Sequence, residues 1–101
     1  MPVPKNSPPS RLERRIPMEV SVVLDGHREL PGKEVTFTQN VSARGARVVT
    51  IRRWALNDRL MIKSPAGNFR SSARVAYCQS LRGEGYAIGV EFLEPRGRWV
   101  V

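Results

Sequence analysis

The sequence predicts an all-β fold, a small six-stranded antiparallel β-barrel, from three observations. Apolar and polar residues alternate with a period of two in several short segments, as half-buried strands do. Clusters of Gly, Pro, Asn and Asp separate those segments. No stretch shows the 3.6-residue period of an amphipathic helix of useful length. Because a sheet of this size must hide its edges, closure into a barrel is the favoured arrangement.

The first two strands are predicted over residues 18–25 and 33–40, joined by a turn region with the pairs Asp-Gly and Pro-Gly. One face of the first strand is formed by Met18, Val20, Val22 and Leu24. In the second strand the alternation predicts Val35 and Phe37 inward, with Thr36 and Thr38 outward.

Four more strands are predicted: one over 46–51, one through Leu60 and Ile62, one over 69–80 and one over 86–94. Gly89, in the middle of the last strand, indicates a bend or bulge. The alternation places five aromatic side chains in the core: Phe37, Phe69, Tyr77, Tyr86 and Phe92.

The chain length of 101 residues predicts one domain. We expect a flexible arm over 1–10, a barrel domain over 11–94 and a short tail over 95–101, with Trp99 packed on the barrel or on a partner. Four of the eight prolines precede residue 10, which indicates an arm without a core of its own. No secretory signal or membrane span is recognisable, so a cytoplasmic protein is expected.

The net charge of +8 comes from 14 Arg and only 3 Lys against 9 acidic residues. A guanidinium group pairs with two phosphate oxygens at once and stacks on flat rings, so this excess favours an anionic, nucleotide-like ligand. A genome rich in Arg codons would produce the same excess, so composition leaves both explanations open.

Catalytic or metal chemistry is not predicted. His27 is the single histidine and falls in a turn, where a solvated side chain is expected. Cys78 is the single cysteine, predicted on the opposite strand face from Val75 and Tyr77, and is interpreted as a structural thiol. The acidic residues are scattered singly, without a pair suited to acid–base catalysis. We therefore expect no enzyme activity, no metal and no cofactor.

Two short motifs carry the functional information, "RLERR" at 11–15 and "NVSARG" at 40–45. The spacing of Arg11 and Arg15 alone is uninformative in so Arg-rich a chain. The pattern of Asn40, Ser42 and Gly45 is rarer, with about 0.04 matches expected by chance from the composition. Asn offers donors and an acceptor, Ser offers a hydroxyl, and Gly permits positive φ and close backbone approach. The motif is interpreted as a turn that holds a phosphate or a base edge.

Together the two motifs resemble the signatures of the PilZ domain family, Arg-x-x-x-Arg before the first strand and Asp/Asn-x-Ser-x-x-Gly after the second. "ARVAYC" and "IGVEFLE" look like later strands of that family. The resemblance spans residues 11–94 and implies a six-stranded antiparallel barrel that binds cyclic di-GMP. This ligand is a bacterial second messenger with two guanines and two phosphates.

The resemblance also implies roles for individual residues. Arg11 and Arg15 would clamp phosphates and stack on guanine, with Arg14 and Arg44 as secondary contacts. Asn40 and Ser42 would form hydrogen bonds to the ligand, and Gly45 would shape the turn. Ligand binding would then order the arm and change the surface that a downstream protein partner meets.

One departure from the family concerns the C-terminus. Many members continue into a helix, whereas eight residues follow Leu93 here, with Pro95 and Gly97 among them. Two alternatives also stay open. A small basic barrel could bind RNA or single-stranded DNA, although five core aromatics would leave few rings for base stacking. The chain could also be a PilZ-like protein-interaction module that binds no nucleotide.

Overall fold

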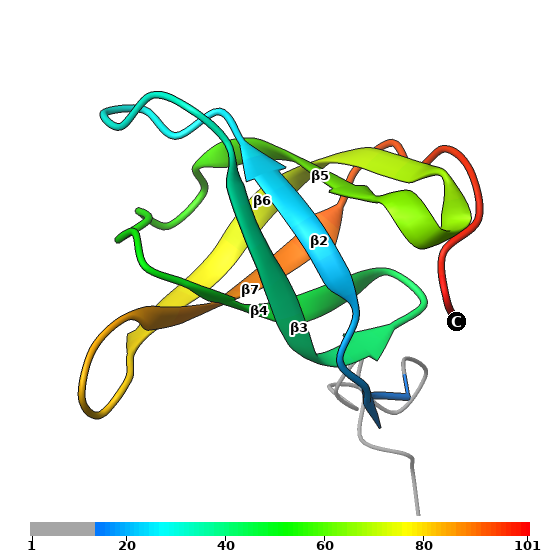
Figure 1. Ribbon diagram of the computed structural model, residues 1–101, viewed down its shortest axis with the longest axis horizontal. Coiled ribbons are helices and arrows are strands. Elements are labelled where there is room, and N and C mark those ends of the chain that lie inside the picture. Colours follow the sequence, from blue (N-terminus) through cyan, green and yellow to red (C-terminus); the bar gives the residue numbers. More distant parts are fainter. Residues whose placement is uncertain (1–13) are drawn as a thin grey trace, which may run out of the picture.

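The computed structural model describes residues 14–101, which form a closed antiparallel barrel (Figure 1). Its six strands are β2 (Ser21–Asp25), β3 (Glu34–Ser42), β4 (Gly45–Thr50), β5 (Arg59–Ser64), β6 (Phe69–Ser80) and β7 (Tyr86–Phe92). Around the barrel they follow the order β3-β2-β5-β6-β7-β4, and β4 pairs with β3 to close the ring. The predicted six-stranded barrel is confirmed.

Two short elements accompany the barrel strands. β1 (Ile16–Pro17) pairs with β3, with Ile16 opposite Val41 and Pro17 opposite Asn40. The 3-10 helix η2 (Pro65–Gly67) connects β5 to β6 and ends at a residue in the left-handed conformation, Asn68. The predicted arm over 1–10 and Arg11 lie outside the described residues.

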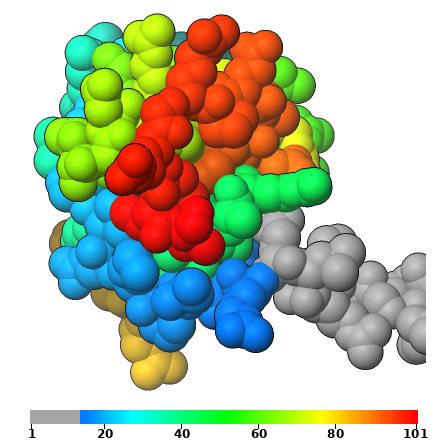
Figure 2. All heavy atoms as spheres, turned by 90° about the vertical axis from the view of Figure 1, so that its right-hand side faces the viewer, coloured from blue at the N-terminus to red at the C-terminus, as the bar shows by residue number. Residues whose placement is uncertain are grey.

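A tryptophan closes each end of the barrel. Trp54, in the segment after β4, is 3% exposed and belongs to the core. Trp99, in the C-terminal tail, packs against Phe69 and Phe92 with ring centroids 4.8 and 5.0 Å away. Figure 2 faces this second end and shows the tail, in red, lying across it. Of the two alternatives predicted for Trp99, packing on the barrel or on a partner, the structure shows packing on the barrel.

The predicted orientation of β3 is wrong. Val35 and Phe37 are 74% and 41% exposed, whereas Thr38 is buried. The Thr38 hydroxyl donates to the carbonyl of Met18 at 2.7 Å and accepts from the backbone N–H of Val20 at 2.9 Å. These bonds offset the free-energy cost of burying the hydroxyl. They also pair two backbone groups of the segment that leads into β2, so they favour the inward orientation of Thr38.

Glu34 stabilises the same orientation at the start of β3. Its carboxylate is buried and accepts hydrogen bonds from the Thr50 hydroxyl at 2.6 Å and the Ile51 backbone N–H at 2.8 Å. The inner face of β3 therefore begins with polar groups that are paired within the fold.

The predicted orientation of the end of β6 is also wrong. Val75 lies opposite Val90 and Tyr77 lies opposite Gly89, so Ala76 is an extra residue, a β-bulge. The bulge reverses the alternation, so Cys78 packs against the core and Tyr77 is only half-buried. Tyr86 is half-buried too. Of the five aromatic residues predicted in the core, two are buried: Phe69 and Phe92.

Candidate ligand-binding site

Strand register places residues from five strands in one row across the sheet. Pro17 of β1 lies opposite Asn40 of β3, which lies opposite Arg47 of β4. Arg47 lies opposite Gly89 of β7, which in turn lies opposite Tyr77 of β6. The row joins the segment after the first motif to the first residue of the second motif.

The second motif is mostly strand rather than turn, which corrects its interpretation as a turn. Residues Asn40 to Ser42 end β3, Gly45 begins β4, and only Ala43 and Arg44 form the turn between them. Ser42 and Gly45 pair directly. The motif is therefore a tight hairpin whose strand residues are fixed by the barrel.

A hydrogen bond connects the two motifs. The guanidinium of Arg15 donates to Oδ1 of Asn40 at 2.9 Å. Arg15 is exposed and Asn40 is half-buried, so both polar groups lie at the surface. Arg14, beside Arg15, is exposed as well.

Ser42 and Gly45 are buried within the hairpin. The Ser42 hydroxyl donates to the Gly45 carbonyl at 3.4 Å, and the Ser42 carbonyl accepts from the Trp99 indole N–H at 2.8 Å. Gly45 does not have positive φ; a Cβ there would overlap the carbonyl oxygen of Val90. Close packing of β4 on β7 therefore requires glycine at this position. The predicted ligand contact of Ser42 stays a prediction.

A small groove of about 140 Å³ lies beside the hairpin. Arg15, Arg44 and Arg74 are among the residues that line it, together with Gly45 and Gly89. Arg74 is paired with Glu91 at 2.8 Å, whereas Arg44 is exposed and its side chain has no partner among residues 14–101. The groove is smaller than a typical ligand pocket of roughly 300–1,000 Å³. A dinucleotide would therefore extend beyond it over the outer face of the barrel.

Sequence reasoning missed two residues of this face, Arg47 and Tyr77. Arg47 donates to Gln39 Oε1 at 2.7 Å and to the Tyr77 hydroxyl at 3.1 Å. The Tyr77 ring lies so close to Gly89 that a Cβ on Gly89 would overlap it. No motif marks Arg47, but its charge between the apolar residues Ala46 and Val48 was a signal for the outer face. The face thus carries four guanidinium groups (Arg15, Arg44, Arg47 and Arg74) against the carboxylate of Glu91.

His27 lies at the other end of the barrel and is not a solvated turn residue. Its ring packs edge-on against Trp54, with centroids 4.6 Å apart. Nδ1 accepts from the backbone N–H groups of Glu29 and Leu30 at 3.1 Å, so Nε2 donates to the Arg53 carbonyl at 2.8 Å. The ring therefore holds two loops together. Residues 14–101 contain no group of three side chains suited to a metal ion, and they form no helix long and apolar enough to cross a membrane.

Comparison with known proteins identifies a matching family and a similar solved structure. The family model described as "PilZ domain" matches residues 9–98. The structure of the Bacillus subtilis inhibitor of motility, MotI/DgrA, superposes with a TM-score of 0.67 at 16% sequence identity. The match covers 91% of this chain but 44% of that one, so the chain spans less than half of that protein's length. At this identity the similarity shows the fold alone. No curated protein matches the chain.

Proposed function

The chain belongs to the PilZ domain family, and we propose that it is a receptor for cyclic di-GMP. The observation that carries the proposal is the hydrogen bond of 2.9 Å between Arg15 and Asn40, because it joins one residue from each motif at the rim of a basic groove. Both side chains are accessible at the surface. A ligand that replaced this bond would meet a guanidinium fork and an amide together.

The chemistry of the face suits a phosphodiester with a purine base. Arg15 and Arg44 are exposed and can pair with phosphate oxygens two at a time. Arg47 lies 5.7 Å from the centre of the Tyr77 ring, which gives the face a flat, cationic platform. The Asn40 amide can donate and accept, as recognition of a guanine edge requires. Ser42 and Gly45 would act by holding the hairpin in shape.

The small volume of the groove implies that further residues must contact the ligand on the side that faces away from the barrel. We infer that Arg11 and Arg14 supply these contacts, with Arg11 and Arg15 clamping the ligand from the N-terminal segment. Binding would then hold that segment against the barrel, and the altered surface would be read by a protein partner. In this mechanism the domain acts by binding, not by catalysis.

Titration calorimetry of the full chain with cyclic di-GMP tests the proposal. We expect saturable heat with the wild type, no saturable heat with GTP, and loss of binding in Arg15→Ala. Arg82→Ala is the matched control, because Arg82 is an exposed arginine in the turn between β6 and β7, outside the groove. Absence of heat with the folded wild type would contradict the proposal. Binding of an RNA oligonucleotide that weakens over decades of added salt would instead support the nucleic-acid alternative.

A further inference from the structure

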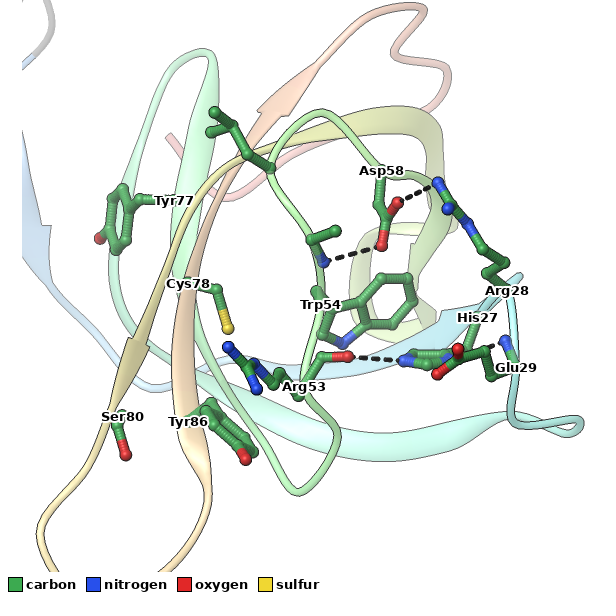
Figure 3. A pocket seen from close by; sticks show the side chains of 12 residues that line it. His27, Arg28, Glu29, Arg53, Trp54, Asp58, Tyr77, Cys78, Ser80 and Tyr86 are labelled. Carbon is green, nitrogen blue, oxygen red and sulfur yellow. Dashed lines mark hydrogen bonds and ion pairs between the residues drawn. The ribbon is translucent and has the colours of Figure 1, made fainter.

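A second hollow, of about 890 Å³, lies at the His27 end of the barrel (Figure 3). One wall is the end of β6 with Cys78 and Ser80, and the opposite wall is the segment 53–58. Cys78 points into this cleft, whereas the Tyr77 side chain points away from it toward the ligand groove. The cleft and the groove therefore lie on opposite faces of the same strand.

The cleft follows an open strand edge. β5 pairs with β6 from Phe69 to Arg74. The last contacts on this side are made by Val75, which accepts from Asn57 N–H at 2.8 Å and donates to the Asp58 carbonyl at 2.9 Å. Asn57 has a φ of 71° and lies in the turn that precedes β5. Within residues 14–101, Tyr77 to Ser80 pair with β7 on one side and with no strand on the other.

An open edge of this kind is a template for another strand, because unpaired N–H and C=O groups lie along it. The walls offer contacts for alternate side chains of an incoming strand. Leu56 is 65% exposed, and the cleft is also lined by Trp54, Cys78 and Tyr86. A buried water-filled site for a small polar molecule would need a more enclosed and more polar lining.

The charges of the cleft specify the partner further. Asp58 is already engaged, by Arg28 at 2.9 Å and by the backbone N–H of Ala55 at 2.8 Å. The guanidinium of Arg53 points toward β6, between Cys78 and Tyr86 (Figure 3). It has no hydrogen bond or ion pair within residues 14–101. Glu29 also lines the cleft, on the side of His27 and opposite β6 (Figure 3). The half of the cleft beside β6 is therefore positive and complements a carboxylate.

We propose that this cleft binds an extended peptide segment of a partner protein, which pairs with the free edge of β6 and places an acidic side chain against Arg53. Main-chain hydrogen bonds to β6 provide the general affinity, as in other cases of strand addition. The carboxylate and an apolar side chain near Leu56 provide the specificity. The proposal does not depend on cyclic di-GMP, because no residue of the two motifs lines the cleft.

The test uses a phage library of random octapeptides selected on the full chain without nucleotide. We expect enriched sequences that combine β-forming residues with Asp or Glu. The selected peptide is then synthesised with a fluorophore, and its Kd is measured by polarisation. Arg53→Glu should raise the Kd at least tenfold, whereas the equal charge change Arg82→Glu, outside the cleft, should leave it unchanged. Circular dichroism checks that both variants are folded.

Backbone pairing has its own readout. N-methylation of alternate peptide amides should abolish binding in one register and leave it intact in the other, because only every second amide of a strand faces its neighbour. Amide hydrogen exchange should show new protection within residues 76–80. The proposal is overturned if no peptide is enriched, if Arg53→Glu leaves the Kd unchanged, or if protection appears elsewhere.

Discussion

The guanidinium of Arg15 donates a hydrogen bond of 2.9 Å to Oδ1 of Asn40, although the two residues are 25 positions apart in the sequence. β1 makes this contact possible, because Pro17 lies opposite Asn40 in the β3 register. A bond between exposed groups adds little to folding stability, since water can replace it at little cost. The contact can therefore be exchanged for a ligand without unfolding the barrel.

Asn40→Ala should weaken cyclic di-GMP binding at least tenfold while changing the free energy of unfolding by less than about 0.5 kcal/mol. The amide is lost from the ligand site, but no buried group loses its partner. Calorimetric titration and urea denaturation measure the two effects. Gln79→Ala removes an exposed amide from β6, away from the groove, and should change neither. An unchanged affinity for cyclic di-GMP in Asn40→Ala would show that Asn40 does not contact the ligand.

Gly89→Ala should destabilise the barrel by about 1–3 kcal/mol, because the added Cβ overlaps the Tyr77 ring. The ring must turn away and would lose the hydrogen bond from Arg47. Urea denaturation of Gly89→Ala, Tyr77→Ala and the double variant forms a cycle. We expect Gly89→Ala to cost much less when Tyr77 is already alanine. Additive costs would show that the two residues do not interact in this way.

The single variants Thr38→Val and Phe37→Thr, compared with each other, test the observed orientation of β3. Valine matches threonine in shape but leaves the buried N–H of Val20 without its side-chain acceptor, so we expect a loss of about 1–3 kcal/mol. Phe37 is exposed, and its replacement should cost less than about 1 kcal/mol. Chemical denaturation of both variants gives the comparison. A larger loss of stability in Phe37→Thr than in Thr38→Val would show that Phe37, and not Thr38, lies in the core.

Two substitutions of Trp99 separate the contribution of its ring to stability from that of its indole N–H. Trp99→Phe keeps an aromatic ring against Phe69 and Phe92 but removes the donor to the Ser42 carbonyl, which should cost about 1 kcal/mol. Trp99→Ala also removes the ring and should cost about 2–4 kcal/mol, toward the lower part of the range for buried aromatics because Trp99 is half-buried. Thermal and urea unfolding measure both. Equal losses would mean that the hydrogen bond, not the packing, holds the tail.

Strong local patterns made the strands predictable. The predicted range of 69–80 agrees with β6, because a long alternating run lies there between two turns. The second motif was found from its residue types alone, and its Asn40 does lie beside Arg15. These features depend on residues close together in the sequence, which is what pattern reading detects.

The sequence-based predictions were wrong where residues distant in the sequence determine which way a side chain points. Within β3, both faces fit an alternating pattern, and the partners that draw Thr38 inward come from residues 18 and 20. In β6, one extra residue at Ala76 reverses the faces of all that follow, and no local signal marks it. Arg47 joins the site through its register with Asn40 and Gly89, which only the closed barrel defines.

Tyr77 contributes to the lining of both the groove and the cleft, although its side chain points toward the groove, so the end of β6 lies between the two proposed sites. Any shift of this strand that favours one occupant alters the affinity for the other. Thermodynamic linkage makes that influence mutual: if cyclic di-GMP changes the peptide Kd by some factor, the peptide changes the Kd of the nucleotide by the same factor. Through such a shift of β6, the nucleotide concentration would influence how strongly the peptide binds.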